Sequence, residues 1–341
     1  MRIRFLVLLI ALAVMATACG GSDDTLTVYS GRSEELVAPL IEQFETATGR
    51  SVEVRYGDSA ELAAQILAEG DNSPADIFFA QDPASLGAVA LADLFVPLDA
   101  DTIAVVPAEL RDPNGLWTGT SGRARSVVYD TTKVDPADLP ATENGLIDAQ
   151  WKGRVAIAPT NGSFLAFVAA KILLDGEEAT LAWLDAMKAN ESPTYPKNSV
   201  IVAAVDDGEV DTGLVNHYYL FRRIAEEGAD SVVAANYFMP GGGAGSLVMP
   251  AGVGVLESSE TADEFVAFLL SEPAQRYFAE ETFEFPLIEG IAPHPDLPAL
   301  GSLNPPEIDL SLLATVLDRA TDLVAEAGPV SYTHLRCRRK F

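Results

Sequence analysis

The sequence predicts an α/β fold of two lobes built on mostly parallel sheets. From Leu26 onward, short apolar runs alternate with stretches of helical periodicity, which is the pattern of strands joined by helical crossovers. The chain has 341 residues, and domains average roughly 150 residues, so two lobes are expected. Hydrophobic residues make up 48% of the chain, which is enough to bury a core in each lobe.

In the first half of the chain, each predicted strand is followed by a predicted helix. The strands are expected at Leu26–Tyr29, Val52–Tyr56 and Asp76–Ala80. The helices are expected around Leu36–Phe44 with a stop at Gly49, after a Ser59 cap with a stop at Gly70, and from Asp82-Pro83 onward. Serine and aspartate cap a helix by accepting hydrogen bonds from its free N–H groups, and glycine ends one in a left-handed conformation.

The second half of the chain repeats this alternation. Strands are expected at Ser126–Tyr129, Arg154–Ala158, Val210–Val215 and Leu247–Leu256. Helices are expected at Phe164–Leu174, Leu181–Lys188, Val200–Asp206, Tyr218–Glu227, Phe265–Leu270, Gln275–Ala279 and Leu312–Ala327.

Two segments, Val105–Arg125 and Gly245–Gly254, are expected to cross between the lobes and to form a hinge. The expected lobes are residues 26–105 joined by about 250–300, and residues 106–249 joined by about 301–328. A cleft between the lobes is the expected place for a ligand.

The charge of the chain excludes one class of partner. The net charge is −28, from 50 acidic and 22 basic residues. Nucleic-acid binding requires a basic face, so no nucleic acid is expected as a partner. Two cysteines exclude a disulfide framework, and three widely spaced histidines argue against a multi-histidine metal site.

Residues 1–18 predict an export signal. Two arginines precede the apolar run Phe5–Met15, which is too short to span a membrane as a mature helix. Small residues then precede Cys19, an arrangement that resembles a bacterial lipobox, whose cysteine is diacylated. We therefore expect an exported protein that is anchored to the cell membrane through lipid on Cys19, with residues 19–25 as a flexible tether. The alternative is an ordinary cleaved signal with an incidental cysteine.

The last residues, 331–341, differ in character from the rest of the chain. Helical periodicity stops at Ala327-Gly328-Pro329, and the residues that follow are basic and unpatterned. They resemble translated sequencing-adapter read-through, so we interpret them as an artefact. A basic docking tail is the alternative.

The stretch Asn216-His217-Tyr218-Tyr219 lies where a predicted strand gives way to a predicted helix. Two neighbouring tyrosines most often serve in packing. The alternative is a ferric site, because Fe(III) is a hard cation that favours anionic oxygen, and a bound cation can deprotonate its ligand. Neighbouring residues point to opposite faces of a strand, but at a strand-to-helix turn they can bind one metal ion together.

Six motifs together carry a family resemblance: Thr27-Val-Tyr-Ser-Gly31, Pro74-Ala-Asp-Ile-Phe-Phe79, Ser121-Gly-Arg-Ala-Arg125, Trp151-Lys-Gly153, Lys197-Asn-Ser199 and Asn216-His-Tyr-Tyr219. In this order and spacing the chain resembles the ferric-iron-binding proteins of bacterial ABC import systems, within the periplasmic-binding-protein superfamily. The resemblance covers about residues 25–328. It implies a two-lobed fold of type II, no enzymatic activity, Fe(III) as the transported ligand, and Tyr218 and Tyr219 as its ligands.

The family also holds a small synergistic anion, such as carbonate or phosphate, beside the iron. The matching positions are Asn161, Gly162, Ser163, Asn198 and Asn216. The first three open a predicted helix, where free N–H groups and the helix dipole attract an anion. The alternative is a plain helix cap by Asn161 or Ser163, with Asn198 and Asn216 as turn residues. Arg32, Arg123 and Arg125 lie in motifs expected to form the cleft, and they are expected either to pair with the anion or to form surface salt bridges.

Two positions depart from the pattern of the family. Some members add a histidine and a glutamate from the first lobe, and those positions hold Ser33 and Gln81 here. We interpret Ser33 as a helix cap. Gln81 follows a strand, where open α/β sheets place ligands, so it remains a candidate metal ligand although it is neutral. Water, carbonate, phosphate or a chelator is expected to fill the remaining positions around the iron.

The sequence thus predicts a monomeric solute-binding lipoprotein that captures ferric iron or a ferric chelate for an ABC permease. One alternative is the same fold binding an organic anion, a polyamine or a thiamine-like solute. Another is an anchored hydrolase, which lacks support because no serine-histidine-aspartate, HExxH or P-loop pattern is present.

Overall fold

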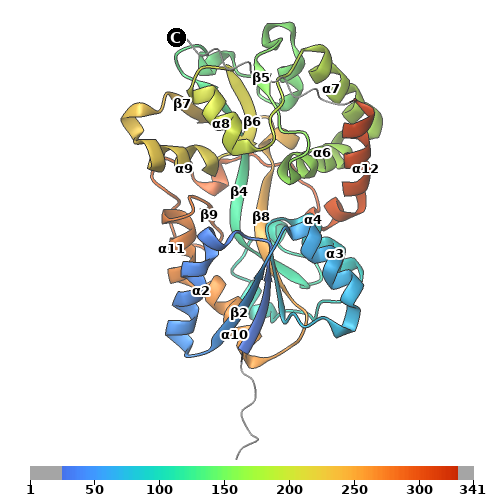
Figure 1. Ribbon diagram of the computed structural model, residues 1–341, viewed down its shortest axis with the longest axis vertical. Helices are drawn as coiled ribbons and strands as arrows, with labels where there is room; N and C mark the ends of the chain where they lie inside the picture. Colours follow the sequence, from blue (N-terminus) through green and yellow to red (C-terminus); the bar gives the residue numbers. More distant parts are fainter. Residues whose placement is uncertain (1–24, 329–341) are drawn as a thin grey trace, which may run out of the picture.

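Two strands run antiparallel through the middle of the molecule and connect its two lobes (Figure 1). They are β4 (Trp117–Asp130) and β8 (Val248–Val255), and they are paired from Trp117 opposite Gly254 to Ala124 opposite Val248. The structure, a computed structural model, describes residues 25–328. Cys19, the predicted signal and the tail at 331–341 lie outside these residues.

The lobe that we call the β1 lobe contains the first three strands. The strands are β1 (Thr25–Ser30), β2 (Ser51–Tyr56) and β3 (Ile77–Ala80), in the order β2-β1-β3-β8-β4. The helices are α2 (Glu34–Thr48), α3 (Ser59–Glu69), α4 (Pro83–Leu91), α5 (Ala100–Ile103), α10 (Glu260–Leu269) and α11 (Glu272–Glu280). Alternate residues of the strands bury against α2, α10 and α11 on one face and against α3 and α4 on the other.

The lobe that we call the β6 lobe lies at the other end of the crossing strands (Figure 1). Its strands are β5 (Val155–Ala156), β6 (Thr212–Asn216) and β7 (Ala234–Tyr237). Its helices are α6 (Gly162–Asp175), α7 (Glu177–Ala189), α8 (Asn198–Asp206) and α9 (Tyr218–Glu227). The last helix, α12 (Leu313–Glu326), packs against α6 and α7 of this lobe and against α4 of the β1 lobe.

The strand pairing is mixed, which corrects the expectation of mostly parallel sheets. Among the described strands, β1–β2, β1–β3 and β5–β6 are parallel. β4 pairs antiparallel with β6, β7, β8 and the short strand β9 (Phe285–Pro286), and β3 pairs antiparallel with β8. The reason is topological, because one crossing strand leaves the β1 lobe and the other returns to it.

Several element boundaries also differ from the prediction. The predicted strand at Ser126–Tyr129 is only the end of β4, in which residues Thr118–Arg123 are small or polar but buried. The expected crossing at Val105–Arg125 is a strand only from Trp117. Strands β7 and β9 were not predicted. None of the helices in residues 25–328 is long and apolar enough to cross a membrane.

The two serines predicted as helix caps bind differently from the expectation. Ser33 occupies the cap position of α2, but its side chain accepts no capping hydrogen bond. Asp58, and not Ser59, caps α3, and the Oγ of Ser59 instead accepts a hydrogen bond from the N–H of Gln81 at 2.9 Å. The predicted caps Asp82 and Asn161 are confirmed, since their side chains accept bonds from Ser85 N–H and Ser163 N–H.

Candidate functional site

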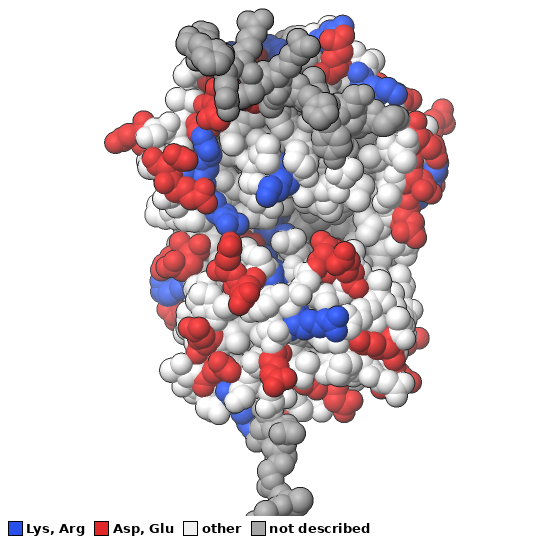
Figure 2. Space-filling view, viewed as in Figure 1, with Lys and Arg blue, Asp and Glu red and all other residues white. Residues whose placement is uncertain are grey.

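A cavity of about 170 Å³ lies between the lobes and takes lining residues from both. The space-filling view shows acidic side chains over both lobes and basic side chains within the hollow at their junction (Figure 2). The β1 lobe contributes Asp58, Ser59, Gln81, Asp82 and Ser85; the β6 lobe contributes Asn161, Gly162, Ser163, Asn216, Tyr218 and Tyr219; the crossing strands contribute Arg123 and Met249. The predicted tyrosines, Gln81 and the start of α6 therefore do meet in one place.

Tyr218 and Tyr219 form one wall of this cavity. They are the first residues of α9, and only His217 separates them from the end of β6 at Asn216. Their rings stack with centroids 4.3 Å apart and planes 29° apart, so the turn does place both side chains on the same side. Burial raises the pKa of Tyr218 far above its usual range, its neighbour Tyr219 raises it further, and Arg123 opposes both. Tyr218 is therefore a neutral phenol at neutral pH until a cation displaces its proton.

The opposite wall of the cavity comes from the ends of strands in the β1 lobe. Gln81 follows the last residue of β3, and Asp82 caps α4 by accepting hydrogen bonds from the N–H and the hydroxyl of Ser85 at 2.8 and 3.0 Å. Burial raises the pKa of Asp82, and the Ser85 hydrogen bonds and Arg123 oppose that rise. Asp82 and Asp58 are the carboxylates of the lining. From the sequence, Asp82 lies beside the candidate Gln81, but its role as a helix cap competes with a role as a ligand.

Polar groups around the start of α6 form a hydrogen-bond network beside the cavity. The Oδ1 of Asn161 accepts hydrogen bonds from the N–H of Ser163 at 3.1 Å and from its hydroxyl at 2.6 Å. The Nδ2 of Asn198 donates to Asn161 Oδ1 at 3.2 Å and to Ser163 Oγ at 2.9 Å. Asn198 lies behind the lining residues and supports them. The α3, α4 and α6 helices all begin at the cavity, so three positive helix ends face it.

Arg125 is not a lining residue, but it brings a buried positive charge directly behind the lining residues Ser163 and Asn216. It is 1% exposed, and its Nη1 donates to Asn216 Oδ1 at 3.1 Å and to Ser163 Oγ at 3.3 Å. Its Nε and Nη2 have no hydrogen-bond partner among the described residues. Burial lowers its pKa to about 10, so the guanidinium remains charged at neutral pH. A buried cation without a carboxylate partner is costly unless an anion joins it.

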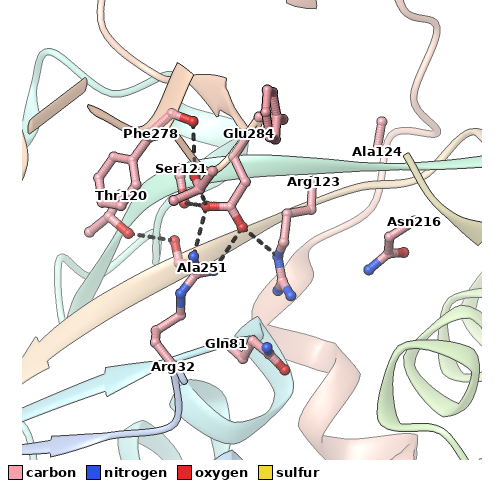
Figure 3. A network of polar contacts seen from close by, with 12 residues as sticks. Arg32, Gln81, Thr120, Ser121, Arg123, Ala124, Asn216, Ala251, Phe278 and Glu284 are labelled. Atoms are coloured by element: carbon pink, nitrogen blue, oxygen red, sulfur yellow. Dashed lines mark hydrogen bonds and ion pairs between the residues drawn. The ribbon is translucent and has the colours of Figure 1, made fainter. Parts of the chain in front are cut away.

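Arg32 is placed differently from the expectation. Its Nη1 and Nη2 each donate to one oxygen of Glu284 at 2.8 Å, and both side chains are 1% exposed (Figure 3). Burial alone would lower the pKa of Arg32, but the Glu284 carboxylate outweighs it and raises that pKa. Arg32 is not a lining residue of the cavity. The structure therefore gives Arg32 a protein carboxylate as its partner where the sequence suggested a bound anion or a surface salt bridge.

Comparison with known proteins decides the family of this chain. The model of a family described as bacterial extracellular solute-binding proteins matches residues 72–306. The chain belongs to this family. The predicted two-lobed fold and the prediction that the protein is not an enzyme are thereby confirmed, because solute-binding proteins are the non-enzymatic components of transport systems.

Relatives of this solute-binding protein are named for ferric iron. The major ferric iron-binding protein of Neisseria meningitidis serogroup B is 36% identical over 326 residues, which cover 93% of this chain and 97% of the relative. The crystal structure of iron-bound HitA from Pseudomonas aeruginosa has a TM-score of 0.82 and 34% identity, covering 89% of this chain and 99% of that one. A Trichodesmium protein in complex with iron and citrate has a TM-score of 0.79 and 29% identity, with the same coverage.

Proposed function

We propose that this solute-binding protein captures ferric iron in the cavity between its lobes and delivers it to an ABC permease. The observation that carries the proposal is the stacked pair Tyr218 and Tyr219 on a wall of a cavity that both lobes line. Two phenolate oxygens suit Fe(III), which favours hard anionic ligands. The similarity over about nine-tenths of the chain to a protein named for ferric iron, and to an iron-bound structure, supports the same cargo.

The experiment that tests this function is ferric loading followed by visible absorbance. Phenolate bound to Fe(III) is expected to give a red-orange charge-transfer band, which an organic anion, a polyamine or a thiamine-like solute would not produce. Titration with a ferric chelate at neutral pH measures the stoichiometry, and one iron per chain is expected. A chain that stays colourless and metal-free after loading would remove ferric iron as the cargo.

We propose further that the iron is held together with a small anion, carbonate or phosphate. Arg123, Arg125, Ser163 and the start of α6 are the groups that would receive it. The support is the unpaired Nη2 of Arg125, whose Nη1 already bonds to the lining residues Ser163 and Asn216, together with the three helix ends at the cavity. On the β1 lobe, Gln81 and Asp82 face the tyrosines, and Asp82 can supply the negative charge that Gln81 lacks.

Replacing Arg125 with glutamine is expected to lower iron affinity by about tenfold when carbonate or phosphate is present, because one charge-assisted hydrogen bond to the anion is lost. Competition against a chelator at fixed anion concentration measures this loss. The matched control is Arg154→Gln. Arg154 lies over the ring of Trp151 at 5.1 Å, as Arg125 lies over that of Phe167 at 5.5 Å, but its side chain bonds to Asp211 and the carbonyl of Gln150 and not to lining residues of the cavity. An Arg125→Gln variant with the same anion dependence as the wild type would contradict the anion site.

We propose that the chain moves as two lobes about the crossing strands. One lobe comprises residues 26–105 with about 250–300, and the other comprises residues 106–249 with about 301–328. Small-angle scattering is expected to show a smaller radius of gyration after ferric loading, because cargo held by both walls favours the closed form. Arg222 of α9 already reaches Glu35 of α2 across the lobes at 3.7 Å. Equal radii with and without cargo would exclude closure.

We propose that the protein is anchored outside the cytoplasm through lipid on Cys19. Each buried CH₂ of a lipid chain contributes about 0.8 kcal/mol, so a diacylated cysteine holds firmly. The variant Cys19→Ala is expected to appear in the soluble fraction or to remain unprocessed, while the wild type stays in the membrane fraction. Intact mass of the membrane-extracted protein checks this, and an unmodified Cys19 would contradict it.

A further inference from the structure

The segment Thr282–Glu284 forms hydrogen bonds with residues of both lobes. It lies between α11 and β9, and β9 pairs with the crossing strand β4 at Ser121 and Gly122. Within it, Phe283 has a φ of 57°, in the left-handed region that a bulky residue rarely adopts. Such backbone strain persists where the surroundings enforce it, and it is frequent at functional sites.

The side chain of Glu284 holds the β1 lobe. It is 1% exposed and accepts the two hydrogen bonds from Arg32 together with one from the Ser121 hydroxyl at 2.8 Å, and Arg123 lies 3.9 Å away (Figure 3). Burial alone would raise the pKa of this carboxyl, but Arg32 and Arg123 outweigh it and hold the pKa below its usual range. Glu284 therefore remains charged and keeps Arg32 fixed.

Arg32 is connected to the cavity wall through Gly31 and Ser59. Arg32 follows Gly31, which packs so closely on Ser59 that a Cβ at position 31 would collide with the Ser59 side chain and backbone. Ser59 lines the cavity and accepts the N–H of Gln81. The path from Glu284 through Arg32 and Gly31 thus ends at residues that face the tyrosines.

The backbone of Phe283 binds His217 of the β6 lobe. Its carbonyl accepts a hydrogen bond from Nε2 of His217 at 2.7 Å, and Nδ1 of His217 accepts one from the N–H of Ala124 at 3.2 Å. His217 is fully buried, and burial lowers its pKa to about 4, so it is a neutral imidazole with a defined tautomer. It directly precedes Tyr218, and the ring of Phe221, one turn along α9, stacks on Phe283.

We propose that Phe283 and Glu284 are positioning residues that fix the two walls of the iron site relative to each other, Glu284 through Arg32 and Phe283 through His217. This inference rests on the proposed ferric function. Two adjacent residues bind opposite lobes, so their backbone sets the distance from the tyrosine pair to Gln81 and Asp82. Outer partners of this kind orient metal ligands, and changing one costs about 10- to 100-fold in metal affinity.

A purely structural role is the competing explanation, and the chain contains a matched control for it. Lys171 and Glu143 form a second buried pair at 3.0 Å, with both side chains also 1% exposed. That pair lies in the β6 lobe and is not among the lining residues of the cavity. Glu143 also accepts a hydrogen bond from the N–H of Gly245 at 3.0 Å, and glutamine keeps an oxygen for that bond, so Glu143→Gln reports the loss of the buried ion pair alone.

The test compares Glu284→Gln and His217→Ala with Glu143→Gln in thermal unfolding, in affinity for ferric citrate and in the wavelength of the charge-transfer band. We expect the first two variants to shift the band and to lose about 10- to 100-fold in affinity, and Glu143→Gln to lose stability alone. The conservative variant His217→Gln keeps an N–H donor for Phe283, and it is expected to restore most of the wild-type band. This pair of His217 variants decides the question if Glu284→Gln does not fold.

The outcomes separate the two proposals. If His217→Ala and folded Glu284→Gln both keep the band wavelength and the iron affinity of the wild type, the positioning role is overturned and the ferric function remains. The positioning role is also overturned if His217→Gln shifts the band and lowers the affinity as much as His217→Ala does. A wild-type protein without a band overturns the ferric function, and the positioning role falls with it.

Discussion

The double variant Tyr218→Phe with Tyr219→Phe is expected to lose the charge-transfer band completely and to bind ferric iron far more weakly. Both changes keep the ring and remove the oxygen, so the stacked contact at 4.3 Å survives and the fold should persist. Loss of two ligands to the metal itself is expected to exceed the roughly 10- to 100-fold cost of altering an outer partner. Visible absorbance and competition against citrate measure the two effects.

A matched control separates the ligand role from the general cost of removing a phenol. Tyr237 in β7 is also partly buried and its hydroxyl lies 3.5 Å from the carbonyl of Leu139, but it does not line the cavity. Tyr237→Phe is expected to keep both band and affinity. If the double variant binds iron with unchanged affinity and spectrum, the pair serves in packing and an organic solute becomes the leading cargo.

The strand-to-helix turn that carries Tyr218 and Tyr219 was predictable because local signals determine it. Apolar periodicity over a few residues predicts a strand at Val210–Val215 and a helix at Tyr218–Glu227. The structure has the strand at Thr212–Asn216 and the helix with the same bounds. The Asn161 cap at the start of α6 was visible for the same reason, since a cap bonds to N–H groups two or three residues away.

The partner of Arg32 was not predictable because no local signal marks it. Glu284 is one of 50 acidic residues and lies 252 positions from Arg32, and only the tertiary fold brings the two together. The crossing strand β4 was only partly recognised for a related reason. Its residues Thr118–Arg123 are small or polar, so they lack a strand pattern, and their burial arises from the two lobes that enclose them.

The direction of the strands was missed as well. Alternation of strands and helices favours parallel pairing, but β4 and β8 carry the chain between the lobes in opposite directions. As a result, β4 pairs with β8 up to Ala124 and with β6 from Arg125 onward. Arg123 and Arg125 point to the same face of β4 at that change, and this explains why two arginines reach the junction of the lobes.

The second large effect expected is a steep dependence of iron affinity on pH. The pKa of Tyr218 is raised, mainly by burial, so the cargo-free protein holds this proton at neutral pH. Ferric iron must displace one proton from each phenol that it binds, and each released proton makes affinity rise about tenfold per pH unit. His217 contributes nothing in this range, because burial keeps it neutral down to a pKa of about 4.

With both phenols as ligands, affinity at about pH 6 is therefore expected to be about a hundredfold lower than at about pH 7. Competition against citrate, corrected for the protonation of citrate itself, measures the slope. The single variant Tyr219→Phe offers the internal control, since one fewer proton is released and the slope should fall to about tenfold per pH unit. An affinity that stays level between these two pH values would mean that the phenols keep their protons. The metal would then have to be bound by other groups of the cavity, such as Asp82, the carboxylate next to Gln81 in the sequence.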